Sequence, residues 1–200
     1  MRHRVFLMGI CSGIVLLLTS CASYSASALG NFPTALVRSS KENGINVVAK
    51  AFNVADCKKY LDRDLLAVGY QPVQLFIQNN SDKSLIFSMD SFSLPYGKVN
   101  EVAERVHTST LGRAVGYGIG ALFLWPLAIP AVVDGMMSYQ ANEALDRDFA
   151  GKIAENQIIF PHSHFNKIVF VPIHDYQPGF SVTLLDVETG KPQMVKVVAN

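Results

Sequence analysis

The sequence has few of the residues that carry chemistry in proteins. It contains three cysteines, five histidines and one tryptophan in 200 residues, and only 16% of its residues are charged. With a positive mean hydropathy, this low charge argues against disorder and predicts that part of the surface meets lipid or a partner. A nucleotide-binding motif is also missing, since Gly116-x-Gly118-x-Gly120 lacks the Lys of a phosphate loop and the preceding strand of a dinucleotide fingerprint.

An excess of basic residues is absent as well. The formal net charge is +1, and without residues 1–20, which hold Arg2 and Arg4 and no acid, 15 basic and 16 acidic residues leave −1. This balance argues against nucleic acid as a partner.

The N-terminus has the pattern of a processing signal. A basic start at Arg2-His3-Arg4 precedes fourteen apolar residues from Val5 to Leu18, too few to span a membrane, and then Leu18-Thr19-Ser20-Cys21. This boundary resembles the lipobox of bacterial lipoproteins. The resemblance implies that residues 1–20 are a signal peptide and that Cys21 is acylated and bound to membrane lipid. The alternative is an ordinary secretory peptide with a chance cysteine.

Two further expectations follow for the residues after Cys21. In the lipoprotein family the next residue acts as an address, and Ala22 is not the Asp that retains lipoproteins in the inner membrane, so we expect the periplasmic face of the outer membrane. Residues 21–44 are rich in Ser, Ala and Gly and predict a flexible tether with little order up to about Phe32.

Cysteine use limits the redox chemistry. Cys11 leaves with the signal and Cys21 carries lipid, so Cys57 is the remaining thiol and no intramolecular disulfide forms. Cys57 is interpreted as a buried small residue that begins a short helical turn after Asp56. The alternative is a reactive thiol whose pKa is lowered by Lys58 and Lys59.

Short β-branched segments with turn signals lie on both sides of a central apolar stretch. They predict about eight strands, at Ile45–Val54 with Val48, Phe52 and Val54 on one face, and at Pro72–Asn79, Leu85–Ser88, Phe92–Leu94, Gln157–Phe160, Lys167–Pro172, Gly179–Asp186 and Met194–Val198. Asn79 to Lys83 has turn composition. Such spacing favours an antiparallel β-sandwich over an α/β fold.

The aliphatic strand, Asn-Asn-Ser-Asp turn and returning strand resemble immunoglobulin-like domains of uncharacterised bacterial lipoproteins. The resemblance implies a mainly β fold, an immunoglobulin-like antiparallel β-sandwich of residues 45–95 and 155–200, and nothing about function.

The remaining segment, residues 96–154, is predicted to be an inserted apolar helical hairpin, which makes the chain α+β. One amphipathic helix contains Val99, Val102, Ala103 and Val106, and a second contains Met137, Ala141, Leu145 and Phe149. Between them Ala114–Val133 carries no charge, with Arg113 and Asp134 at its ends and prolines at 126 and 130. We expect it to fold back near Trp125 so that Arg113 and Asp134 meet.

The apolar stretch has three alternative environments: one leaflet of a bilayer, the surface of the sandwich or another subunit, and a full membrane span. Gly112, Gly116 and Gly120 recur at every fourth residue, which permits close backbone approach on one helix face and resembles the glycine zippers of some outer-membrane lipoproteins. Together with Trp125 they are the candidate residues for membrane or oligomer contact.

Candidates for chemistry are weaker. His162 and His164 are two residues apart, and His174-Asp175 is a candidate to complete a metal site with them, but solvated loop histidines are the default interpretation. Asp62-Arg63-Asp64 and Asp146-Arg147-Asp148 are interpreted as charged surface. We therefore expect no metal and no cofactor.

The functional hypothesis is a non-catalytic, lipid-anchored binding or structural module of the cell envelope. Its partners are membrane lipid and an envelope protein or a second copy, and the apolar insert serves membrane contact or oligomerisation. The alternative is an envelope hydrolase or a metal- or thiol-dependent enzyme that uses His162, His164, His174 or Cys57.

The lipobox makes a direct prediction. Cys21→Ser should abolish acylation, because the thioether bond requires the Cys21 thiol. Mass spectrometry of the envelope fraction tests this, and an unmodified Cys21 in the wild-type protein would refute the anchoring argument.

Overall fold

A computed structural model describes residues 23–30, 40–108 and 128–200, and the side chains of 23–30, 43–108 and 136–200. The chain divides into two compact units. One comprises Ser25–Val106 and Asp146–Asn200 and is called the two-sheet domain below. The other comprises Met1–Tyr24 and His107–Leu145.

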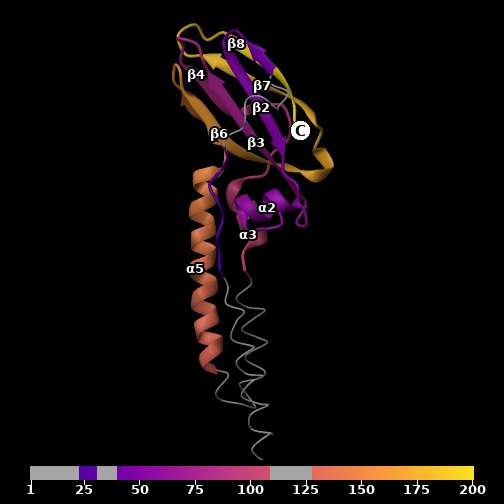
Figure 1. The fold of residues 1–200 in the computed structure, drawn as a ribbon, viewed down its shortest axis with the longest axis vertical. Helices are drawn as coiled ribbons and strands as arrows, with labels where there is room; N and C mark the ends of the chain where they lie inside the picture. Colours follow the sequence, from indigo (N-terminus) through magenta and orange to yellow (C-terminus); the bar gives the residue numbers. More distant parts are fainter. Residues whose placement is uncertain (1–22, 31–39, 109–127) are drawn as a thin grey trace, which may run out of the picture. The chain divides into compact units, whose positions relative to one another are not determined.

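The two-sheet domain contains two antiparallel sheets in the described part of the chain (Figure 1). The order in the first sheet is β1 (Ser40–Glu42), β2 (Ile45–Ala51), β3 (Tyr70–Asn79) and β6 (His164–Pro172). The order in the second is β5 (Gln157–Ile159), β4 (Leu85–Phe92), β7 (Gly179–Asp186) and β8 (Pro192–Val198). With the helices described below, these sheets confirm the α+β class.

Alternation along the strands builds one core between the sheets. Val73, Leu75 and Ile77 of β3 are all fully buried in this core, because every second side chain of a strand points to the same face. The rings of Phe87 and Phe165, which come from opposite sheets, have centroids 4.6 Å apart. Burial of each such side chain contributes roughly 1.5–3 kcal/mol.

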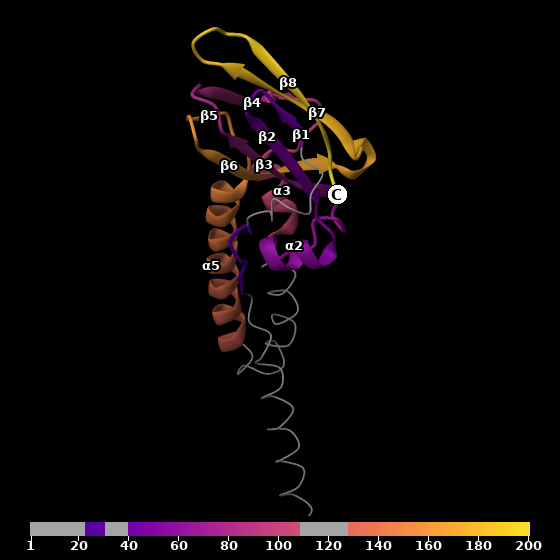
Figure 2. The ribbon, with the colours of Figure 1, turned by 45° about the horizontal axis from the view of Figure 1, so that its top comes forward.

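Helices cover the other face of the first sheet at one end of the domain (Figure 2). They are α2 (Val54–Leu61), α3 (Val99–Val106) and the last turns of α5 (Ala128–Lys152). The Phe149 ring of α5 lies 5.5 Å from the Phe170 ring of β6. The Arg105 guanidinium of α3 lies 5.3 Å from the ring of Tyr70, at the start of β3. A 3₁₀ turn, η2 (Ile173–Asp175), follows β6.

Helix α2 begins earlier than the sequence predicts. The Asn53 side chain accepts a hydrogen bond from the Asp56 N–H, and the Asp56 carboxylate accepts one from the Asn53 N–H. This capping box starts the helix at Val54, so the predicted start of a helical turn at Cys57, after Asp56, is corrected by three residues. The inclusion of Val54 in a strand is wrong for the same reason.

The other predicted strands are found with small shifts. The two short strands expected at Leu85–Ser88 and Phe92–Leu94 form a single strand, β4, whose pairing with β7 shifts register between Phe87 and Phe92. The Asn79 side chain accepts a hydrogen bond from the Ser81 N–H at 3.1 Å, so the turn after β3 forms as its composition predicts.

Both predicted amphipathic helices are present. Val102, Ala103 and Val106 are buried in α3, and Ala141, Leu145 and Phe149 in α5, whereas Met137 is exposed. Pro130 is the third residue of α5 as described, a position where proline is tolerated because the first-turn N–H groups have no partner within the helix. Residues 109–127, and with them most of the apolar stretch Ala114–Val133, lie outside the described residues.

Gly97 permits the close approach of α3 to β3. A Cβ atom at Gly97 would lie 2.6 Å from Tyr70 Cε1 and 3.0 Å from Val102 Cγ2. The Gly97 N–H also donates to the Phe170 carbonyl at 2.8 Å, so the backbone cannot move away without losing this bond.

Gly97→Ala should therefore destabilise the protein by about 1–3 kcal/mol, as overpacking of a filled site does. The matched control is Gly179→Ala, since a Cβ there would meet nothing within 4 Å. Urea unfolding compares the midpoints. Equal losses for the two variants would contradict the proposed packing.

Candidate functional site

The C-terminal end of α2 joins parts of the chain that are far apart in sequence. Asp62, the C-cap residue with φ of 50°, accepts the Ser25 N–H at Oδ2 (2.9 Å) and Lys58 Nζ at Oδ1 (2.5 Å). Arg63 Nη1 lies 3.2 Å from the same Oδ2. We call the group of Ser25, Lys58, Asp62, Arg63 and Val106 the junction.

Arg63 extends the junction to α3. Its Nε donates to the carbonyl of Val106, the last residue of α3, at 3.1 Å. Ser25 is four residues from Cys21, and Val106 is eight residues from the start of the apolar stretch at Ala114. One carboxylate and one guanidinium therefore hold both segments that lead towards the expected membrane contacts.

The environment of Asp62 keeps its carboxylate ionised. Burial alone would raise the pKa of Asp62, but the Lys58 hydrogen bond, the Ser25 N–H and the charges of Lys58 and Arg63 together lower it below its usual value. An ionised acceptor makes the hydrogen bond to the Ser25 N–H stronger than one between neutral groups.

The end of α5, where the chain re-enters the two-sheet domain, is fixed beside the junction. Lys152, near the end of α5, is buried, and its Nζ donates to the Tyr60 carbonyl at 2.8 Å and lies 2.6 Å from Asp148 Oδ2. Ser25, the end of α3 and the end of α5 all contact residues 60–63.

Residues Ser25–Gly30 are hydrogen-bonded to the rest of the two-sheet domain. The Ser27 N–H donates to the Lys59 carbonyl at 2.8 Å, and the Gly30 carbonyl accepts Gln74 Nε2 at 2.9 Å. The sequence predicts a flexible tether for residues 21–44, but this part is hydrogen-bonded, and residues 40–42 form β1. The difference arises because Ser25 and Ser27 bind through their backbone N–H groups, which composition does not reveal.

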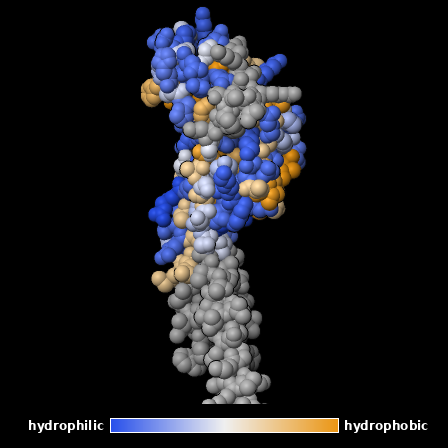
Figure 3. Space-filling view, viewed as in Figure 1, coloured by the Kyte–Doolittle hydropathy of each residue, from blue (hydrophilic) through white to orange (hydrophobic). Residues whose placement is uncertain are grey.

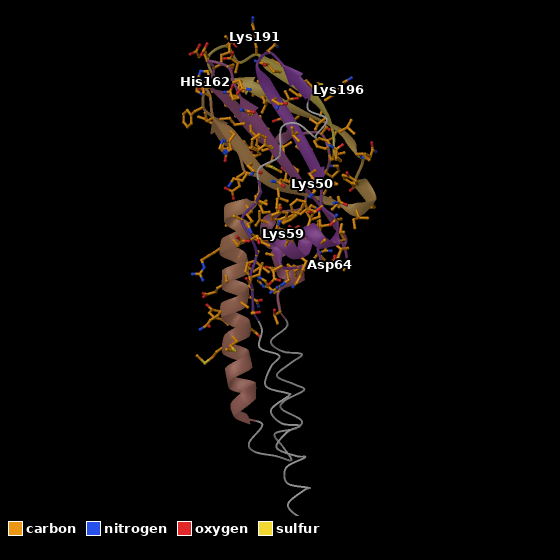
Figure 4. All side chains as sticks on the ribbon, viewed as in Figure 1. Lys50, Lys59, Asp64, His162, Lys191 and Lys196 are labelled. Carbon is orange, nitrogen blue, oxygen red and sulfur yellow. The ribbon has the colours of Figure 1, made fainter. Side chains whose placement is uncertain are left out.

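The opposite end of the two-sheet domain carries polar loops. A hollow of about 630 Å³ lies among the β1–β2, β3–β4 and β7–β8 connections and is lined by Asn43, Gly44, Asn80, Ser81, Asp82, Lys83, Asp186, Lys191, Pro192 and Gln193. We call these residues the loop cluster. Figure 4 shows Lys191 and His162 at this end and Lys59 and Asp64 at the α2 end.

The Asp186 side chain holds the loop cluster in place through an ion pair and hydrogen bonds. Its side chain is 1% exposed, accepts Lys83 Nζ at 2.6 Å, and accepts the N–H groups of Glu188 and Thr189 at 2.9 and 3.0 Å. The hydrogen bond from Lys83, followed by that from the Thr189 N–H, lowers the pKa of Asp186 to about 2. This arrangement fixes the β7–β8 turn and needs no ligand.

The structure does not bring the candidate histidines together. His162 has a φ of 53° in the β5–β6 turn, and its Nε2 lies 3.0 Å from Asp82 Oδ1. His164 begins β6 and stacks on Phe76, whereas His174 follows the end of this strand. At about 3.3 Å per residue, strand β6 separates His164 from His174 by roughly 30 Å. No group of three His, Cys, Asp or Glu side chains with metal-binding geometry occurs among the described residues.

Cys57 is fully buried in α2, as the sequence predicts. Burial raises the pKa of its thiol to about 11, and the nearby carboxylates of Asp64 and Asp56 also raise it. The alternative of a thiolate activated by Lys58 and Lys59 is therefore corrected, because Lys58 pairs with Asp62 and Lys59 lies over the Tyr60 ring.

The other predicted site residues cannot be placed. Cys21, Gly112, Gly116, Gly120 and Trp125 lie outside the described residues, as does Arg113. Sequence reasoning missed the junction, since Asp62-Arg63 was interpreted as charged surface. No sequence signal indicates that Arg63 meets Val106, which is 43 residues further along the chain.

In the described residues no helix has the length and apolar character needed to cross a membrane. The chain matches no known family model, no curated protein and no solved structure.

The pKa of Asp186 predicts a pH dependence. The group is ionised in the folded state down to about pH 2 but protonates near pH 4 when unfolded, so its contribution to stability is present above about pH 4 and is lost as the pH falls towards 2. The difference in unfolding free energy between wild type and Asp186→Asn should be large at pH 7 and shrink below pH 4. Asp82→Asn, which removes an exposed carboxylate from the same end, is the control. A pH-independent difference would contradict the assignment.

Proposed function

We propose that this chain is a lipid-anchored protein of the cell envelope that acts as a non-catalytic binding or structural module. The observation that carries the proposal is the junction, where the segment next to Cys21 and the segment that leads to the apolar stretch are held by adjacent residues, Asp62 and Arg63. The two segments that lead to the expected membrane contacts therefore leave the two-sheet domain at the same place, as an anchored module requires.

The proposed location is the periplasmic face of the outer membrane. It rests on Cys21 as the acylated residue and on Ala22 as the following residue. Acyl chains contribute about 0.8 kcal/mol for each buried CH₂ group, so two or more chains hold a protein stably at a bilayer.

The strand order supports an immunoglobulin-like assignment for the two-sheet domain. If β2, β3 and β6 correspond to strands A, B and E, and β4, β7 and β8 to C, F and G, the neighbours in each sheet agree with that fold, and β5 takes the place of C′ beside C. The agreement is incomplete, because β1 pairs outside this pattern and the described residues contain no strand D. On this assignment the insert lies between C and C′.

We propose that the insert is a closed helical hairpin that contacts lipid or another subunit. In the second unit the Thr108 N–H donates to Asn142 Oδ1 at 2.8 Å, and Asn142 Nδ2 donates to the Thr108 carbonyl at 3.3 Å. These two hydrogen bonds join residues that are separated by 33 others in the sequence, which supports a hairpin that is closed at its base. Gly112, Gly116, Gly120 and Trp125 are the proposed contact residues.

The alternative function is an envelope hydrolase or a metal- or thiol-dependent enzyme. His174 would have to act apart from His162 and His164, since β6 lies between them, and the Cys57 thiol is buried and protonated at neutral pH. Metal analysis and maleimide labelling of the native protein distinguish the two functions. Bound zinc, or fast labelling of Cys57, would favour the enzyme.

Membrane fractionation tests the proposed function. The wild-type chain should sediment with the outer membrane, and Ala22→Asp should move it to the inner membrane by supplying the retention residue. Cys57→Ser is the matched control, because it removes a thiol without touching the anchor and should leave the location unchanged. Recovery of the wild-type protein in the soluble fraction would refute the proposal.

A further inference from the structure

The length of chain between the proposed lipid anchor and the folded domain is short. Ser25 is bound to Asp62, and only the three residues 22–24 lie between it and Cys21. A fully extended chain advances at most about 3.6 Å per residue, so the Cys21 and Ser25 Cα atoms can be no more than about 14 Å apart. The acylated residue therefore stays close to the end of the domain that carries α2.

The loop cluster lies much farther from this anchor. The ten-residue strand β3 runs from Tyr70, beside α2, to Asn79, where the loop cluster begins, and such a strand spans roughly 30 Å. The connection between Cys21 and Ser25 is at most about 14 Å long, which is shorter than this span. The loop cluster therefore cannot take the place of the α2 end at the bilayer.

A second attachment restricts the orientation further. The Arg63–Val106 hydrogen bond holds the start of the insert at the same junction, and eight residues lead from Val106 to Ala114. If the apolar stretch also meets lipid, the domain has two attachments at one end and cannot turn over on a single flexible point.

The exposed side chains at the α2 end are both apolar and charged. Val54 is 57% exposed, Lys58 and Lys59 are exposed, and Figure 3 shows hydrophobic residues beside hydrophilic ones on the visible face. Exposed apolar side chains also occur near the loop cluster, at Phe160 and Val187. The orientation therefore rests on the two attachments and not on a difference in polarity between the two ends.

We infer that the α2 end of the two-sheet domain faces the bilayer to which Cys21 is anchored, and that the loop cluster faces away from it. This inference rests on the proposed lipid anchor. It adds an orientation and a membrane-facing surface, which includes Lys58, Lys59 and Val54.

Quenching of site-specific fluorophores measures this orientation. The full acylated chain is reconstituted into vesicles of phosphatidylethanolamine and phosphatidylglycerol that contain a nitroxide-headgroup lipid, with a thiol-reactive fluorophore at Lys59→Cys or Lys191→Cys. Both side chains are exposed, and the buried Cys57 does not compete for the label. Quenching should be several-fold stronger at position 59 than at position 191.

A longer anchor provides a matched test of the cause. Eight Gly and Ser residues inserted between Ala22 and Ser23 add up to about 28 Å of reach and should reduce quenching at position 59 towards the level at 191. The same insertion after Gly190, in the β7–β8 turn, should leave quenching at 59 unchanged.

The outcomes separate the two claims. If the chain does not remain with the vesicles, the lipid anchor is wrong and the orientation falls with it. If the chain remains but positions 59 and 191 are quenched equally, or if the longer anchor has no effect, the orientation alone is wrong, and contact of the α2 end with a protein replaces contact with lipid.

Discussion

The arrangement of this domain depends on the interactions of the Asp62 carboxylate. Asp62 is the C-cap residue of α2, and its carboxylate accepts the Ser25 N–H and pairs with Arg63, which in turn binds the last carbonyl of α3. The exposed ion pair with Lys58 contributes only about 0–1 kcal/mol, and the exposed but directional hydrogen bond from the Ser25 N–H contributes about 0.5–1.5 kcal/mol. The backbone contacts, rather than the ion pairs, therefore determine where the N-terminal segment lies.

The two-sheet domain is interrupted in sequence by residues 107–145, which belong to the other compact unit. The chain is fixed on either side of this segment, at Val106 by Arg63 and at Lys152 by its bond to Tyr60. The core between the sheets is formed by strand residues together with Leu94, Ala154 and Ala199, and it contains none of the described residues of 107–145. The β core is therefore built without this segment, which is compatible with the proposed role of the segment in contacts outside the domain.

The strands and helices follow from sequence patterns because burial repeats at fixed intervals along them. Val73, Leu75 and Ile77 alternate as a half-buried strand requires, and Val102, Ala103 and Val106 follow the period of a helix. The junction has no such signature, since Ser25 and Val106 take part through backbone groups and Arg63 contacts a residue 43 positions away. The sequence does not predict the separation of His162 from His174 either, because this separation depends on where strand β6 begins and ends.

The central claim is that the segment after the proposed lipid anchor is part of the folded domain. Hydrogen exchange of the Ser25 and Ser27 amides in the full chain tests it most directly, since both amides donate hydrogen bonds to α2 and its cap residue. The account predicts that these amides are protected to a degree similar to the amides within α2. Exchange of both at the rate of an unstructured peptide would contradict it.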